Sequence, residues 1–189
     1  MAKFFGNLHA VLGVGFVLAL ALIFAVPSGW DLEQQMIRWL HTFFGVLWIG
    51  LLYYFNFVQI PTMPKIPAEL KPGVSKHIAP SALFFFRWGA AMTVLFGLLI
   101  AWRANYLIEA LTLSGEGAKL LIGIGMWLAL IMAFNVWFVI WPAQQKALGL
   151  VEADDATKAA AAPRAMMFSR LNTLLSIPML YCMISANLA

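Results

Sequence analysis

Three histidines, His9, His41 and His77, are the side chains of this sequence best suited to bind a haem iron or another metal. Imidazole is a common haem ligand, and a ligating histidine has its second ring nitrogen held by a hydrogen bond. No HxxxH or HExxH spacing occurs, so a zinc site of that type is not indicated. His41 and His9 lie near opposite ends of their apolar segments, at depths that differ by on the order of 20 Å. We therefore expect His41 to bind haem b or a metal, with His9 and His77 as further candidate ligands that could meet each other.

His41 also starts a polar face on its segment. Residues on this face recur every three or four positions, which is the spacing of one side of a helix. The face should point into a helical bundle, because polar groups in lipid need partners. Its members are His41, Gly45, Trp48, Leu52, Asn56 and Gln59.

Two arginines and three asparagines within apolar segments are candidates for binding a substrate or an anion. Arginine presents paired, planar donors that match carboxylates and phosphates. If these side chains converge, they form a polar pocket distant from His41. Two alternatives stay open, since the arginines could extend toward lipid headgroups and the amides could simply tie helices together. The five residues are Arg87, Arg170, Asn56, Asn135 and Asn172.

The elements that position these residues are long apolar segments. Of the 189 residues 63% are apolar and only 11% are charged, far from the composition of a soluble domain. The runs are long enough for membrane helices and too continuous for barrel strands. We predict an all-α membrane protein, one transmembrane domain over residues 1–189 with a bundle of about five helices. The expected helices are 4–26, 33–60, 80–104, 119–141 and 165–188.

Charge and cysteine content exclude several classes of protein. The net charge of +4 comes without a basic run, so nucleic acid is not expected as a partner. The single cysteine, Cys182, excludes a disulfide within the chain, and without a CxxCH motif there is no covalently attached c-type haem. No acidic residue lies deep in a segment, which argues against a proton relay or a cation-coupled transporter.

The loops divide the molecule into two ends. We call side A the end with the long loops 61–79 and 143–164, and side B the end with the short loops 27–32 and 103–118. Basic residues collect on side A, so side A should be cytoplasmic. We expect a bacterial inner-membrane protein with its N-terminus in the cytoplasm and its C-terminus outside. Side A carries Lys3, Lys65, Lys71, Lys76, Arg87, Lys146, Lys158, Arg164 and Arg170, against Arg38, Arg103 and Lys119 on side B.

Three segments carry a family resemblance. They are Ile37–His41 with the following Gly45 and Trp48–Gly50, then Ile131–Pro142 with Gln144–Lys146, and Ser169–Leu180. The sequence from about Ile37 to Ser185 resembles the N-terminal membrane domain of the cytochrome c-linked urate oxidases, also called urate hydroxylases. His77 through Trp88 resembles that domain more weakly. The resemblance implies an integral membrane domain that oxidises a purine and passes electrons to a c-type cytochrome.

The sequence departs from that family in three ways. It is shorter, it lacks a CxxCH motif, and Leu171 stands where a histidine is expected. A cytochrome would therefore be a separate chain. We predict a membrane redox protein that holds haem b or a metal and passes electrons to a separate cytochrome or a quinone. The alternatives are a non-catalytic accessory subunit of a larger membrane complex and, less favoured, a small transporter or channel.

Overall fold

The computed structural model describes residues 2–26 and 29–186, and within them the chain forms helices and loops without strands. Five of its helices are long and apolar enough to cross a membrane, which confirms the predicted all-α fold. The five are Leu8–Ala25, Leu32–Lys65, Lys71–Arg103, Ala118–Ala147 and Asp155–Ser185.

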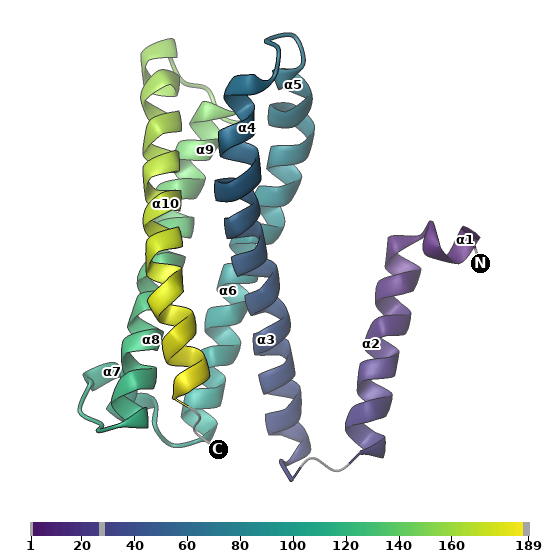
Figure 1. Ribbon diagram of the computed structural model, residues 1–189, viewed down its shortest axis with the longest axis vertical. Coiled ribbons are helices and arrows are strands. Elements are labelled where there is room, and N and C mark those ends of the chain that lie inside the picture. Colours follow the sequence, from purple (N-terminus) through teal and green to yellow (C-terminus); the bar gives the residue numbers. More distant parts are fainter. Residues whose placement is uncertain (1, 27–28, 187–189) are drawn as a thin grey trace.

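Four of these long helices form an antiparallel bundle (Figure 1). Their main parts are α3 (Leu32–Tyr53), α6 (Ala79–Arg103), α8 (Ala118–Phe134) and α10 (Asp155–Ser185). The short α7 (Leu107–Thr112) packs on α8 at side B. At side A, α3 continues through α4 (Ile60–Thr62) and a 3-10 turn at Met63–Lys65. There α6 is preceded by α5 (Lys71–Gly73), and α8 ends in α9 (Trp141–Ala147).

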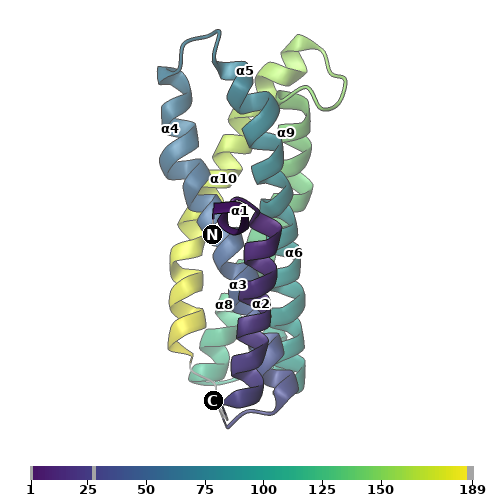
Figure 2. The ribbon, with the colours of Figure 1, turned by 90° about the vertical axis from the view of Figure 1, so that its right-hand side faces the viewer.

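The remaining long helix, α2 (Leu8–Ala25), lies beside the side B half of α3, and the short α1 (Ala2–Phe5) turns away from its end (Figures 1 and 2). None of the residues of α2 is buried. Its ring contacts to the bundle come from Phe16, whose centroid lies 5.3 Å from those of both Trp39 and Phe43. The helix is apolar on all sides, which is typical of a segment surrounded by lipid or by another protein.

The helices are longer at side A than the sequence predicted, and the two side A loops are correspondingly shorter. Helix 33–60 continues to Lys65, helix 80–104 is preceded by helical turns from Lys71, and helix 119–141 continues to Ala147. The last helix begins at Asp155 rather than 165, because Asp154 caps it and the following alanines favour helix. The first helix is interrupted at residues 6–7, and Asn7 caps α2. The predicted end at 188 falls outside the described residues.

Prolines caused most of these boundary errors. Each of three π-helical stretches, Tyr54–Gln59, Val74–Ile78 and Asn135–Ile140, ends two residues before a proline. A proline ring clashes with the carbonyl four residues earlier, which in a regular helix forces a break. The wide π turn moves that carbonyl away and lets the helix pass the proline. The three prolines are Pro61, Pro80 and Pro142.

The most extensive helix contact joins α3 and α6. A Cβ on Gly89 would lie 3.3 Å from the backbone nitrogen of Trp48, so the missing side chain brings the two backbones together. At side B the Arg103 guanidinium lies 2.7 Å from the Glu33 carboxylate. These contacts fix the relative height of α3 and α6, and with it the surroundings of His41.

Candidate functional site

A cavity of about 710 Å³ lies in the side B half of the bundle, between α3, α6, α8 and α10, and is partly open to the outside at Val46 and Ile184. Its walls are mainly apolar. The polar side chains on it are few and come from α3, α6 and the turn after α6, as is usual for a ligand site. They are Arg38, His41, Thr42, Trp48, Thr93 and Tyr106, with Trp30 at the same end as Arg38.

His41 lies on the wall of this cavity with one ring nitrogen fixed. Its Nδ1 lies 2.9 Å from the backbone carbonyl oxygen of Thr93 on α6. Because a carbonyl only accepts, Nδ1 carries the proton and donates it, and Nε2 keeps its lone pair. This is the arrangement that metal-binding histidines need.

Gly97 makes room for the His41 ring. A Cβ on Gly97 would lie 2.9 Å from Cε1 of His41, closer than real Cβ atoms come to another group, and a tight 3.2 Å from its Nδ1. The Thr93 hydroxyl donates to the Gly89 carbonyl at 2.7 Å, and the Thr93 carbonyl accepts from the imidazole. One face of α6 therefore forms a cradle for this imidazole.

The side B end of the cavity carries a positive charge. Arg38 lies one turn before His41, and its guanidinium carbon lies 4.1 Å from the centre of the Trp30 ring. The Tyr106 side chain is buried at the same end. Burial raises the pKa of the Tyr106 phenol, and the nearby Arg38 charge partly offsets that rise. The phenol is thus neutral, and Arg38 supplies the positive charge there.

The inner end of the cavity is formed by Trp48. This indole is fully buried, yet its Nε1–H has no hydrogen-bond partner within the described part of the chain. A buried donor without a partner is costly and indicates a missing ligand or water. Trp48 and Leu52, both predicted on the inward face with His41, are the most deeply buried residues of α3, which confirms that part of the predicted face.

The predicted amides form a hydrogen-bonded band nearer side A. Asn135 donates to the side-chain oxygen of Asn172 at 2.9 Å, and Asn172 donates to the carbonyl of Met132 at 2.9 Å. Asn56 donates to the hydroxyl of Ser169 at 2.8 Å. The structure thus brings Asn56, Asn135 and Asn172 into one band that ties α10 to its neighbours, and it lies outside the cavity.

The two predicted arginines do not join that band. The Arg87 guanidinium carbon lies 3.9 Å from the centre of the Trp141 ring and 5.5 Å from that of Phe84. Arg170 is exposed. Neither arginine therefore forms a shared polar pocket with the three asparagines.

The other two histidines also lie away from the cavity. His9 is exposed near the start of α2, and His77 is exposed in the π-helical stretch before α6. No cluster of three or more His, Cys, Asp or Glu side chains able to hold a metal occurs within the described residues. The geometry therefore singles out His41 among the three predicted ligands.

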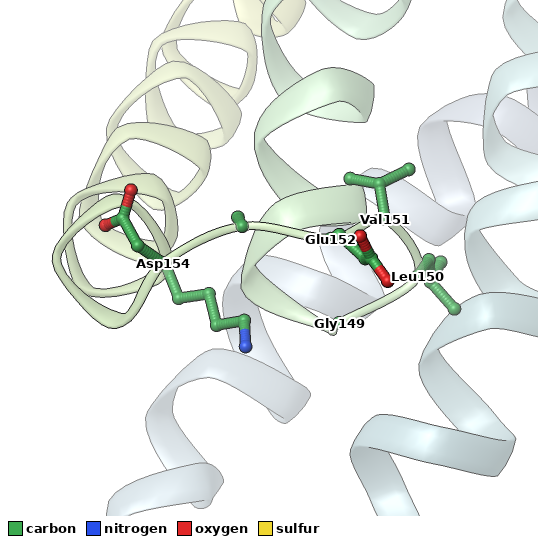
Figure 3. Close-up of a pocket in the computed structure, with 7 residues that line it drawn as sticks. Gly149, Leu150, Val151, Glu152 and Asp154 are labelled. Atoms are coloured by element: carbon green, nitrogen blue, oxygen red, sulfur yellow. The ribbon is translucent and has the colours of Figure 1, made fainter.

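A separate hollow of about 660 Å³ lies on the surface at side A, where residues 149–154 join α9 to α10 (Figure 3). It is lined by loop residues and Lys158. Asp154 caps α10 by accepting from the backbone N–H of Thr157 at 2.7 Å. None of the predicted site residues reaches this hollow.

Several residues of the cavity were missed from the sequence. Arg38 had a usable signal, because it stands three residues before His41 and thus on the same helical face. Thr93 and Gly97 follow Gly89 at four-residue spacing, which indicates close helix packing but no chemistry. Tyr106 had no signal, since its role depends on how the turn after α6 packs. Trp48 was placed on the inward face, but nothing in the sequence indicated that its N–H lacks a partner.

Comparison with known families gives one match. Residues 88–189 match the family described as Urate oxidase N-terminal. The match contains the segments Ile131–Pro142 and Ser169–Leu180, while the segment around His41 lies outside it. No curated protein and no solved structure matches the chain. Since the match covers more than half of its residues, this chain belongs to the urate oxidase N-terminal family.

Proposed function

We propose that this chain is a multi-pass membrane redox protein that binds haem b through His41 and passes electrons to a separate c-type cytochrome or a quinone. The observation that carries this proposal is the His41 ring. It lines a cavity inside an apolar bundle, its Nδ1 is held by the Thr93 carbonyl, and its Nε2 is available for iron.

The rest of the cavity also fits a haem b. Its volume of about 710 Å³ is within the range of cofactor cavities, and its walls are mainly apolar, as a flat macrocycle requires. A haem b carries two carboxylates on one edge, and Arg38 at the side B end offers paired donors to them. The Trp48 indole would close the inner end against water.

The chain's own residues have defined tasks in this proposal. Haem supplies one-electron chemistry when bound. Thr93 orients the imidazole, Gly97 leaves space for it, and Arg38 anchors the carboxylate edge toward side B. The apolar side chains of α8 and α10 exclude water, and such burial influences the redox potential.

Urate oxidation itself receives no support from the position at which the family resemblance led us to expect a histidine. Leu171 is 39% exposed on the outside of α10. Its neighbour Asn172 is fully buried and takes part in the amide band. A histidine at 171 would point away from the His41 cavity, so we do not assign the purine chemistry to this chain.

The excess of basic residues on side A supports an inner-membrane location with side A in the cytoplasm. The cavity would then lie in the half of the bundle that faces the outside. Arg38 and Tyr106 would be nearest to that surface, where a soluble cytochrome in the periplasm could approach.

The test is the haem content of purified variants. We expect wild-type protein from haem-replete cells to carry haem b, His41→Ala to lose it, and both His9→Ala and His77→Ala to keep it. The latter two are matched controls because their side chains are exposed and lie outside the cavity. Haem retention in a folded His41→Ala variant would contradict the assignment.

A second candidate function is an accessory subunit, and the packing of α2 favours it. No residue of this apolar helix is buried, and it touches the bundle through few side chains. Another membrane chain could cover it. Stable co-purification with a larger complex, together with absence of haem from this chain, would support the accessory role over the redox role.

A further inference from the structure

We propose that Met126 is the second axial ligand of the haem, on the face opposite His41. This inference rests on the proposed function and extends it, because it assigns the iron a histidine and a thioether as its two protein ligands.

Few side chains around the cavity are able to bind iron besides His41. Three methionines, Met126, Met179 and Met183, line it from α8 and α10, the walls that face His41. Tyr106 is also present, but it belongs to the turn after α6 at the side B end. No lysine or second histidine lines the cavity. The ligand set therefore points to a thioether.

One hydrogen bond between α6 and the π-helical end of α8 shows the relative depth of the two helices. The indole N–H of Trp137 donates to the backbone carbonyl of Arg87 at 3.0 Å. The two helices are antiparallel, and each rises by about 1.5 Å per residue. Gly97 lies ten residues from Arg87 toward side B on α6. Trp127 lies ten residues from Trp137 toward side B on α8. Gly97 and Trp127 therefore lie at similar depth.

The His41 ring lies against Gly97, so His41 on α3 and Met126 on α8 line the cavity at nearly the same depth. The core packing agrees with this register. Met126 belongs to the same hydrophobic cluster as Leu98, the residue next to Gly97. Met179 lies three residues, just under one turn, before Cys182, which packs on Gly125, so on α10 it is slightly nearer side A than Met126 is.

The side chain of Met126 faces inward. It is 8% exposed, whereas its neighbour Trp127 is 43% exposed and donates its N–H to the Leu111 carbonyl on the outside of α8. A thioether is a soft, uncharged and flexible ligand, which suits a mainly apolar cavity. It also needs no counter-charge, and the cavity offers no carboxylate.

This ligand set has a functional consequence. A histidine and a methionine fill both axial positions, so the iron has no open position for oxygen. Methionine also raises the reduction potential of a haem relative to stronger donors. The site would thus transfer electrons rather than activate oxygen.

The experiment compares Met126→Leu with Met179→Leu and Met183→Leu, which are similar in volume and so conserve packing. We expect wild-type ferrous protein to be low-spin and not to bind carbon monoxide. Met126→Leu should keep its haem, become high-spin, bind carbon monoxide and have a lower reduction potential. The other two variants should behave like the wild type.

The outcomes separate the two proposals. Wild-type protein without haem would contradict the proposed function itself. A haem that His41→Ala removes, but whose spin state and carbon monoxide binding are unchanged in Met126→Leu, would overturn Met126 alone. A high-spin haem that binds carbon monoxide in Met179→Leu or Met183→Leu, rather than in Met126→Leu, would also overturn Met126 as the ligand. If Met126→Leu does not fold, near-infrared magnetic circular dichroism of ferric wild-type protein decides, because absence of the sulfur–iron charge-transfer band would overturn the proposal.

Discussion

At the scale of single residues, polar side chains of the same type have different roles because of where the helices place them. His41 lies on a cavity wall with its Nδ1 fixed, while His9 and His77 are exposed. The sequence predicted His41 correctly as a residue inside the bundle, because a polar group in an apolar segment needs a partner. It could not identify that partner, since the partner is a backbone carbonyl that any residue at position 93 would supply.

The role of Gly97 is tested by adding one methyl group. In Gly97→Ala the new Cβ would overlap the His41 ring. Overpacking of this kind costs about 1–3 kcal/mol of folding stability, and a displaced His41 ring should also bind haem more weakly. Titration of the apoprotein with haem measures the change. Gly45→Ala is the matched control, because on the same cavity its Cβ would meet only Thr93 at an ordinary 3.8 Å.

Asn172 is predicted to serve stability rather than chemistry. Asn172→Ala removes its bonds to Asn135 and to the Met132 carbonyl inside the bundle. We expect unfolding in mixed micelles to become easier by about 1–3 kcal/mol, with haem content unchanged. Leu171→Ala, next to it on the exposed side, should have a much smaller effect. A loss of haem without a loss of stability in Asn172→Ala would show that the amide band belongs to the site.

At the scale of the elements, the existence and order of the five long helices followed from the length of the apolar segments. Their ends did not. Pro61, Pro80 and Pro142 are the usual signals for helix boundaries, yet each is passed by way of a π-helical stretch. Continuation through a proline depends on the packing of the neighbouring helices, which a single sequence does not reveal.

The start of α10 is predicted to depend on pH through its cap. Hydrogen bonds from the Thr157 backbone N–H and hydroxyl lower the pKa of the Asp154 carboxyl below its ordinary 3.8. A carboxyl with a lowered pKa stabilises the folded state above its ordinary value, and this contribution is lost as the pH falls through the lowered value. Amide hydrogen exchange near Thr157 should therefore lose protection below about pH 4.

The matched variant is Asp154→Asn, which keeps a capping oxygen but has no charge to titrate. Protection of the first turn of α10 should then be the same at pH 6 and pH 3, apart from the intrinsic exchange rate. An equal loss of protection in both proteins on acidification would mean that another group is responsible.

At the scale of the whole molecule, the bundle is taller than a bilayer core. The helix from Leu32 to Lys65 has 34 residues and is roughly 51 Å long, against about 30 Å for the hydrocarbon layer. In the proposed membrane the side A ends of the bundle would therefore project beyond the lipid. The sequence predicted two long loops there, because the prolines and charges of those segments were interpreted as loop signals.

The orientation predicts which loops are accessible from outside. Cys182 is buried, so the native chain offers little background for thiol labelling. In intact cells, Ser114→Cys on side B should react with a membrane-impermeant maleimide, and Glu69→Cys on side A should react only after the cells are opened. The reverse pattern would invert the topology and place the cavity toward the cytoplasm.

The central claim is that the His41 cavity holds a redox-active haem. A reduced-minus-oxidised optical spectrum of the purified wild-type protein, with metal analysis of the same sample, tests it most directly. The account predicts a sharp haem b band and close to one iron per chain. A flat spectrum and no bound metal, in folded protein from haem-replete cells, would contradict it.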